Sequence, residues 1–193
     1  MTSLETLDSP LRTFFQELAP LAGSAEDSPH LPEIAGLLAE LARDEDYFAH
    51  HMAGLPTDRF AGIPLHAPER GPRLLLVHRP EGLIGAIHSH SVWVVITPVT
   101  GTETHRRYEV ASRAGNEASR ARIEMTEERH IAPGEHVTLV PPRDIHAHGH
   151  GRGIGEPAYI LILTGDDQFR YAREEFDAEA GTARSLAPGD RGN

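Results

Sequence analysis

Apolar residues in the first fifty positions recur at intervals of three and four, the spacing of one helix face. The stretch SPLRTFFQELAPLAG starts with Ser9 as a potential N-cap and Pro10 at the first helical position. The apolar positions of this stretch and of the next one, SPHLPEIAGLLAELARDEDYFAHH, are Phe14, Phe15, Leu18 and Leu21, then Ile34, Leu37, Leu38 and Leu41. We therefore expect an N-terminal helical segment over residues 1–54, packed on the remainder of the chain.

From about residue 55 the pattern changes to short apolar runs separated by Gly/Pro turns. The runs are RLLLVH, LIGAIHSHSVWVVITPV, TETHRRYEVA, RIEMT, HVTLVP and AYILILTG. Strands and helices do not alternate, so a doubly wound fold is not expected. The pattern predicts an antiparallel sandwich or barrel over residues 55–177.

Three shorter segments complete this prediction. ASRAGNEASRA, residues 111–121, resembles a hairpin loop. FRYAREEFDAEAG, residues 169–181, is expected to be helical or irregular. The end of the chain, residues 178–193, is expected to form a C-terminal tail that frays at SLAPGDRGN.

Composition excludes several classes of protein. The 193 residues contain no cysteine, which removes disulfides, cysteine-based zinc sites and thiol nucleophiles. The formal net charge of -11 argues against a nucleic-acid binder. No apolar run is long enough to cross a membrane, and MTSLETLDSPLR does not resemble a secretory signal. We expect a cytoplasmic protein that acts on a small molecule, without nucleic-acid or membrane partners; the oligomeric state stays open.

Two histidines open the most apolar strand, HSHSVWVVITPVTG. Residues i and i+2 of a strand point to the same face, so His88 and His90 project together beside an apolar wall. Chance supplies roughly one His-x-His in a chain with 13 histidines, so the pair alone is weak evidence for a metal. Trp93 projects to the opposite face and is expected to pack in the barrel wall.

The sequence around the pair resembles the cupins, small double-stranded β-helix barrels with two metal-binding motifs. Gly82, His88, His90 and Gly101 match the first cupin motif, and Gly134, Pro141 and His146 approximately match the second. The resemblance implies a jelly-roll barrel with N-terminal helices and a metal held by His88, His90 and His146. The usual cupin glutamate falls on Val94 or Val95, neither of which can bind a metal.

A three-histidine set is neutral and leaves the charge of a divalent ion uncompensated. Such a set suits iron(II), and nickel, zinc, copper or manganese are alternatives. The metal would favour an anionic co-ligand such as a thiolate or an enolate. On a six-coordinate ion, three positions would remain for a bidentate substrate and dioxygen.

The stretch HSHSVWVVITPVTGTETHRRYE resembles the cysteine dioxygenase-like thiol dioxygenases, in particular the 3-mercaptopropionate dioxygenase type. The matching residues are Trp93, Gly101, Glu103 and Tyr108, and a later segment places Arg173 where that family binds the substrate carboxylate. Two features depart from the family. Its Ser-x-His-x-Tyr set falls on Ile160, Ile162 and Thr164, and its upstream carboxylate-binding residue falls near Gly62, with Arg59 and Arg73 as neighbours.

The other polar candidates have plainer interpretations. His148 and His150 are expected to be exposed, and Glu103 is expected to support its turn or to pair with Arg106 or Arg107. An ordinary surface salt bridge is as good an interpretation of Arg173 as substrate binding. Histidines without a surrounding motif are expected on the surface: His50, His51, His66, His78, His105, His130 and His136.

These observations favour a mononuclear non-haem iron(II) dioxygenase that oxidises a small organic acid with O2, a thiol being one candidate. The first alternative is a non-oxygenase metal-dependent cupin, an isomerase, lyase or hydrolase that uses Zn, Ni or Mn. The second alternative is a non-catalytic cupin that binds a small molecule.

Overall fold

The structure, a computed structural model, describes residues 7–113, 120–156 and 158–190. Three helices come first, α1 (Ser9–Leu18), α2 (Leu31–Ala42) and α3 (Glu45–Ala53). The strands follow: β1 (Ala61–His66), β2 (Arg73–Arg79), β3 (Ile87–His88), β4 (Val94–Thr100), β5 (Glu103–Arg113), β6 (Ala121–Ile131), β7 (Val137–Leu139), β8 (His146–Gly149), β9 (Ala158–Thr164), β10 (Arg173–Asp177) and β11 (Thr182–Leu186). A short 3-10 helix, η2 (Gln168–Arg170), precedes β10.

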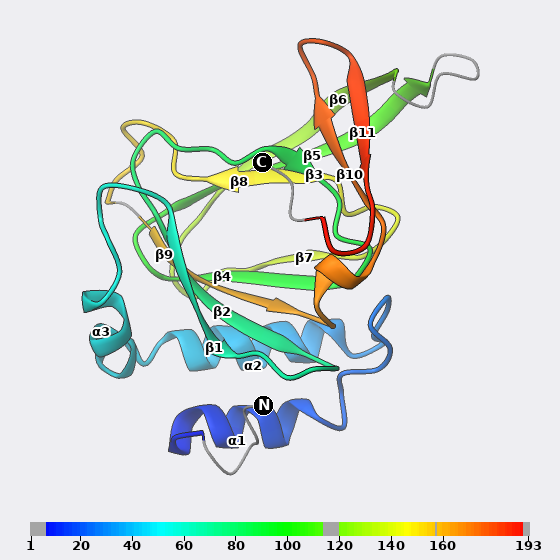
Figure 1. Cartoon of the computed structure of the whole chain (residues 1–193). Helices are drawn as coiled ribbons and strands as arrows, with labels where there is room; N and C mark the ends of the chain where they lie inside the picture. The colour runs from blue at the N-terminus through cyan, green and yellow to red at the C-terminus, as the bar shows by residue number, and fades with distance from the viewer. Residues whose placement is uncertain (1–6, 114–119, 157, 191–193) are drawn as a thin grey trace.

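The strands form two antiparallel sheets that lie face to face (Figure 1). One has five strands in the order β1-β2-β9-β4-β7, and the other has six in the order β11-β10-β3-β8-β5-β6. Several neighbours in each sheet are distant in sequence, as β3 and β8 or β2 and β9 are, which is the crossing connectivity of a double-stranded β-helix. The predicted mainly β fold of cupin type is confirmed.

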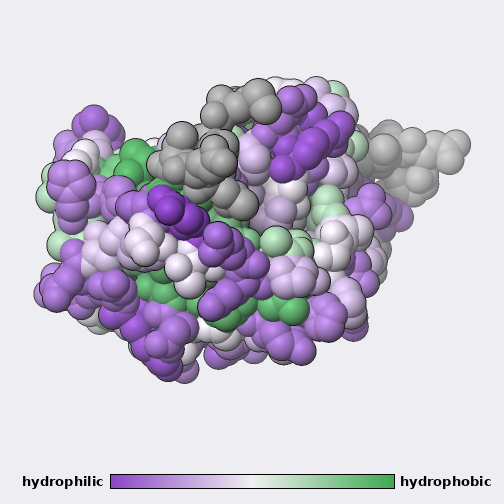
Figure 2. Space-filling model, turned by 90° about the horizontal axis from the view of Figure 1, so that it is seen from below, coloured by the Kyte–Doolittle hydropathy of each residue, from purple (hydrophilic) through white to green (hydrophobic). Residues whose placement is uncertain are grey.

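The helices cover the outer face of the five-stranded sheet (Figure 1). Successive side chains of β4 and of the residue before it point alternately to two apolar layers. Trp93 and Val95 pack against the helices, whereas Val94 and Ile96 point between the sheets. Trp93 is fully buried and its indole N–H donates to the Ser24 carbonyl over 2.8 Å, which confirms its packing role. Seen from the side of α1, the surface is mostly hydrophilic with separate apolar patches (Figure 2).

The C-terminal prediction is wrong in two places. Residues 169–181 contain η2 and β10 instead of a longer helix, and β11 lies within the stretch predicted as a tail. Phe169, Arg173 and Phe176 are spaced four and three apart, which imitates a helix face in the sequence. Pairing of β10 with both β3 and β11 overrides that local pattern.

The predicted hairpin over 111–121 falls between β5 and β6, which pair antiparallel. Residues 114–119 of that loop lie outside the described part of the chain. None of the helices in the described ranges is long and apolar enough to cross a membrane.

Candidate metal centre

Three histidines from the two predicted motifs meet between the sheets. His88 on β3 lies directly opposite His146 on β8, and His90 follows two residues after His88. One ring nitrogen of each lies within 4.8 Å of those of the other two, the only such group of three metal-binding side chains among the described residues. The Nε2 atoms of His90 and His146 are 2.8 Å apart. The structure thus brings together the three residues that the sequence placed at one site.

Hydrogen bonds at the outer nitrogens orient two of these rings. His88 Nδ1–H donates to the Ala86 carbonyl over 2.9 Å. His146 Nδ1 lies 2.9 Å from His105 Nε2, so a proton on His146 Nδ1 would be donated to His105. An imidazole that donates from Nδ1 offers its lone pair at Nε2. Both rings can therefore present Nε2 to a shared ion.

Burial keeps the three imidazoles neutral at pH 7. Desolvation lowers the pKa of His88 and lowers the pKa values of His90 and His146 well below the usual value. The positive charges of Arg173 and Arg79 lower the pKa of His88 further. A metal ligand has to be deprotonated, so this environment prepares the three nitrogens for a cation.

Asp144 holds the turn that carries His90. Its Oδ2 accepts hydrogen bonds from the backbone N–H groups of His90, over 2.8 Å, and Ser91, over 2.9 Å. Ser91 needs such support because its φ of 60° is in the left-handed region. The Ser91 hydroxyl also donates to the Ala172 carbonyl, next to Arg173, over 2.6 Å. The second motif thereby fixes the first through a buried carboxylate two residues before His146.

A second polar group lies beside the three histidines and was missed in the sequence. Arg79 Nη2 donates to His148 Nε2 over 2.8 Å, and His148 Nδ1–H donates to Glu103 Oε1 in a close contact. His148 is only 4% exposed and stacks on His146 with ring centroids 4.9 Å apart, so its predicted exposure is wrong. Burial raises the pKa of Glu103 to about 8, against the opposing effect of Arg79. Of the two alternatives predicted for Glu103, pairing with Arg106 or Arg107 is wrong, since these arginines pair with Glu128 and Glu127.

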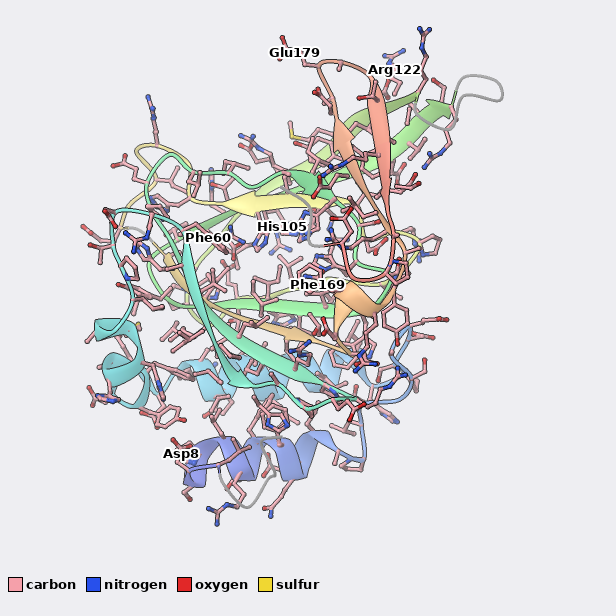
Figure 3. All side chains as sticks on the ribbon, viewed as in Figure 1. Asp8, Phe60, His105, Arg122, Phe169 and Glu179 are labelled. Atoms are coloured by element: carbon pink, nitrogen blue, oxygen red, sulfur yellow. The ribbon has the colours of Figure 1, made fainter. Side chains whose placement is uncertain are left out.

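Four further histidines predicted on the surface are also buried: His66, His78, His105 and His150. His105 lies between the sheets, directly across from His148 on the neighbouring strand (Figure 3). His150 Nδ1–H donates to the Thr102 carbonyl over 2.6 Å. Of the remaining four, His50 and His130 are exposed as predicted, whereas His51 and His136 are half-buried. Period-two alternation from Glu103 to His105, and from His146 to His150, is the sequence signal that could have identified this group.

Arg173 is the first residue of β10 and is 6% exposed, so it is not a surface salt-bridge residue. Its guanidinium lies over the Phe169 ring at 4.9 Å, and Nη2 donates to the Asp190 carbonyl over 2.8 Å. It forms no ion pair with an acidic side chain in the described ranges, and its buried Nε has no hydrogen-bond partner. A buried cation with unused hydrogen-bonding capacity beside neutral histidines suits an anionic ligand.

The other two arginine candidates are engaged elsewhere. Arg59 is exposed and pairs with Asp58 at 3.4 Å. Arg73 forms a close ion pair with Asp167. Neither is left with an unbalanced charge for a substrate carboxylate.

The positions of the family's Ser-x-His-x-Tyr set lie on β9. Ile160 and Ile162 belong to the apolar layer between the sheets. The Thr164 hydroxyl donates to the Asp166 carbonyl over 2.8 Å. None of the three offers a free polar group to the metal centre.

No protein-family model matches the chain. Among solved structures it is similar to the DMSP lyase DddQ from Ruegeria pomeroyi, at 16% identity and a TM-score of 0.46, over 96% of this chain and 100% of that one. It is also similar to a cupin superfamily protein from Desulfitobacterium hafniense, at 13% identity and a TM-score of 0.39, over 58% of this chain and 82% of that one. KdgF from Halomonas sp. matches at 15% identity and a TM-score of 0.37, over 55% of this chain and 80% of that one. Likenesses with TM-scores this low carry no argument about the reaction or the substrate of this chain.

Proposed function

We propose that this chain is a mononuclear non-haem iron(II) dioxygenase that oxidises a small organic acid with O2, with thiol-bearing acids as the first class to test. The observation that carries the proposal is the convergence of three neutral imidazoles, His88, His90 and His146, beside the buried cation of Arg173.

The donor set fits a divalent ion that needs an anionic partner. Valine stands at the carboxylate position of the first cupin motif, whether that is Val94 or Val95, and both side chains are fully buried. Three neutral nitrogens leave the 2+ charge to be balanced by the substrate, and leave coordination positions open. When bound, the iron would supply a site at which an anionic sulfur or oxygen of the substrate and O2 are activated together.

The residues of the chain would bind and orient the substrate. Arg173 offers its guanidinium to the substrate carboxylate, and Phe169 holds that guanidinium in place by contact with its ring. His105 and Asp144 keep His146 and His90 in position. The apolar β9 side chains exclude water from the opposite wall.

Oxygen uptake tests the proposal directly. The protein is loaded with iron(II) without oxygen, mixed with a panel of thiol-bearing and enol-forming carboxylic acids, and transferred to an oxygen electrode. We expect stoichiometric uptake with at least one acid, loss of uptake in His90→Ala, and a raised KM in Arg173→Gln. Full iron occupancy without uptake for any member of the panel would contradict the dioxygenase.

One observation favours a second candidate, a metal-dependent isomerase, lyase or hydrolase that uses Zn, Ni or Mn. The apolar Ile160 and Ile162 replace polar groups that thiol dioxygenases of this type carry beside the metal. This candidate predicts turnover of a substrate without O2, in protein that retains one of those metals through purification.

A further inference from the structure

A pocket of about 380 Å³ lies on the inner face of the five-stranded sheet, next to η2. Its floor includes Gly62 from β1, Leu75 from β2 and Thr164 from β9. Gln168 and Phe169 of η2 form the facing wall. A volume of this size is at the lower end of the range for small-molecule sites.

The wall formed by η2 is shared with the metal centre. Phe169 contacts the Arg173 guanidinium on one side and lines the pocket on the other. The Gln168 side chain lies close to His90. Gln168 Oε1 and His90 Nδ1 are both buried without a hydrogen-bond partner. The pocket therefore adjoins both the three histidines and the proposed carboxylate anchor.

Gly62 keeps this pocket open. It lies opposite Val77, and a Cβ built on Gly62 would come within 3.1 Å of Val77 Cγ2 on the inner face of the sheet. A larger side chain at residue 62 would have to extend into the pocket.

The charges around the pocket are already balanced. Arg73 and Asp167, both lining residues, form a close ion pair with each other. Leu75 and Phe169 supply apolar surface. In contrast to the Arg173 end, this compartment offers an incoming group no uncompensated charge, so a neutral and largely apolar group fits it best.

We infer that the site selects monocarboxylic acids with an extended apolar tail, the carboxylate on Arg173 and the tail in the pocket beside Gly62. This inference rests on the proposed function for the role of Arg173 and adds the class of substrate. It excludes short acids and dicarboxylic acids as preferred ligands.

Binding of three non-reacting probes tests it: acetate, hexanoate and phenylacetate, titrated by calorimetry into iron(II)-loaded protein without oxygen. Each methylene transferred from water to an apolar pocket improves binding by up to about fourfold. We expect hexanoate and phenylacetate to bind at least about tenfold more tightly than acetate. Arg173→Gln should weaken all three acids together.

Gly62→Val should abolish most of the preference for the longer acids over acetate. Leu75→Phe narrows the same pocket from β2 and gives a second, independent variant. Gly36→Val, at an exposed helical glycine with no atom within 4 Å of its Cβ position, is the matched control. Thermal melts of each variant establish that it is folded.

Equal binding of acetate and hexanoate by the unaltered protein would overturn the inference, as would an unchanged ratio in both narrowed variants. Either result leaves iron binding and oxygen uptake with short acids intact, so the proposed function would survive. A protein that binds no iron would overturn the proposed function and this inference with it.

Discussion

The two sheets bury their facing sides equally well and fill them with opposite chemistry. The five-stranded sheet contributes an apolar layer of Val77, Val94, Ile96, Ile160 and Ile162. The six-stranded sheet contributes titratable side chains at comparable burial: Glu103, His105, His146 and His148, with His88 more accessible. Burial therefore does not distinguish structural from functional side chains in this barrel. The chemistry of the groups that each side chain contacts does.

The polar half depends on satisfied hydrogen bonds in a way that the apolar half does not. A buried polar group without a partner costs about 1–3 kcal/mol, and here most members of the cluster bond to one another. Arg79, His148 and Glu103 form one chain, and His105 and His146 form a second. Such an arrangement is costly to keep for stability alone, which is a further argument that it serves a bound ion and substrate.

Replacement of a proposed metal ligand in the polar half should have the largest effect of these changes, on iron(II) affinity. His146→Ala removes one of the three ligand nitrogens, so we expect iron(II) affinity to fall by more than about a hundredfold. This exceeds the usual effect of losing a residue that only hydrogen-bonds to a ligand. Equilibrium dialysis with metal analysis measures this. His50→Ala, at an exposed histidine on α3, should bind iron as the parent does. Equal affinity in both variants would contradict the assignment of the site.

A cavity in the apolar core between the helices and the five-stranded sheet should lower stability and leave the metal untouched. Leu38 is fully buried between α2 and the five-stranded sheet, and Leu38→Ala should reduce the free energy of unfolding by about 3 kcal/mol. Urea denaturation gives this value, and iron stoichiometry of the folded variant should match the parent. A variant that lost iron together with stability would show that the helix-side core and the metal centre are coupled.

The three proposed ligands were accessible from sequence because their signal is local. The i, i+2 spacing of His88 and His90 predicted one shared face, although β3 ends at His88 and His90 follows in a turn, and His146 sits in a second motif of recognisable spacing. The mainly β fold followed from apolar runs between turns. Strand β10 was missed because Phe169, Arg173 and Phe176 have helical spacing, and only pairing with β3 and β11 makes that segment a strand.

Alternation could have pointed to a shared face for some of the buried partners, but which of them lie opposite each other could not be predicted because it depends on strand register. His105 and His148 lie opposite each other on β5 and β8, and Arg79 reaches His148 from β2 of the other sheet. Nothing in the sequence next to any of these residues specifies that pairing. For a histidine without a surrounding motif, the surface is the better prediction. Only the tertiary contacts show which of the 13 histidines are buried.

His105→Phe tests whether a residue that only positions a ligand can be distinguished from a ligand itself. The change keeps the ring but removes the nitrogen that bonds His146 Nδ1, so iron(II) affinity should fall by about tenfold to a hundredfold while binding persists. Competition with a chromophoric chelator measures it. His66→Phe is the matched control, since His66 is buried against Phe15 on the helix side of the barrel. Unchanged affinity in His105→Phe would mean that His105 does not orient His146.

Glu103→Gln tests the charge state of the polar half, and its effect per pH unit should be the smallest of these. Burial raises the pKa of Glu103 from 4.5 to about 8, so between these values the folded protein holds a proton that the unfolded chain has lost. The parent should therefore lose stability through this group as pH rises from about 5 to 8. The glutamine variant lacks this dependence and should gain on the parent by at most about 1.4 kcal/mol per pH unit. Histidine titrations oppose the trend but are present in both proteins, so they largely cancel from the difference. Urea denaturation of metal-free samples at pH 5, 6, 7 and 8 yields the difference curve. A flat curve would mean that Glu103 is ionised throughout, as the negative end of an ion pair with Arg79 through His148.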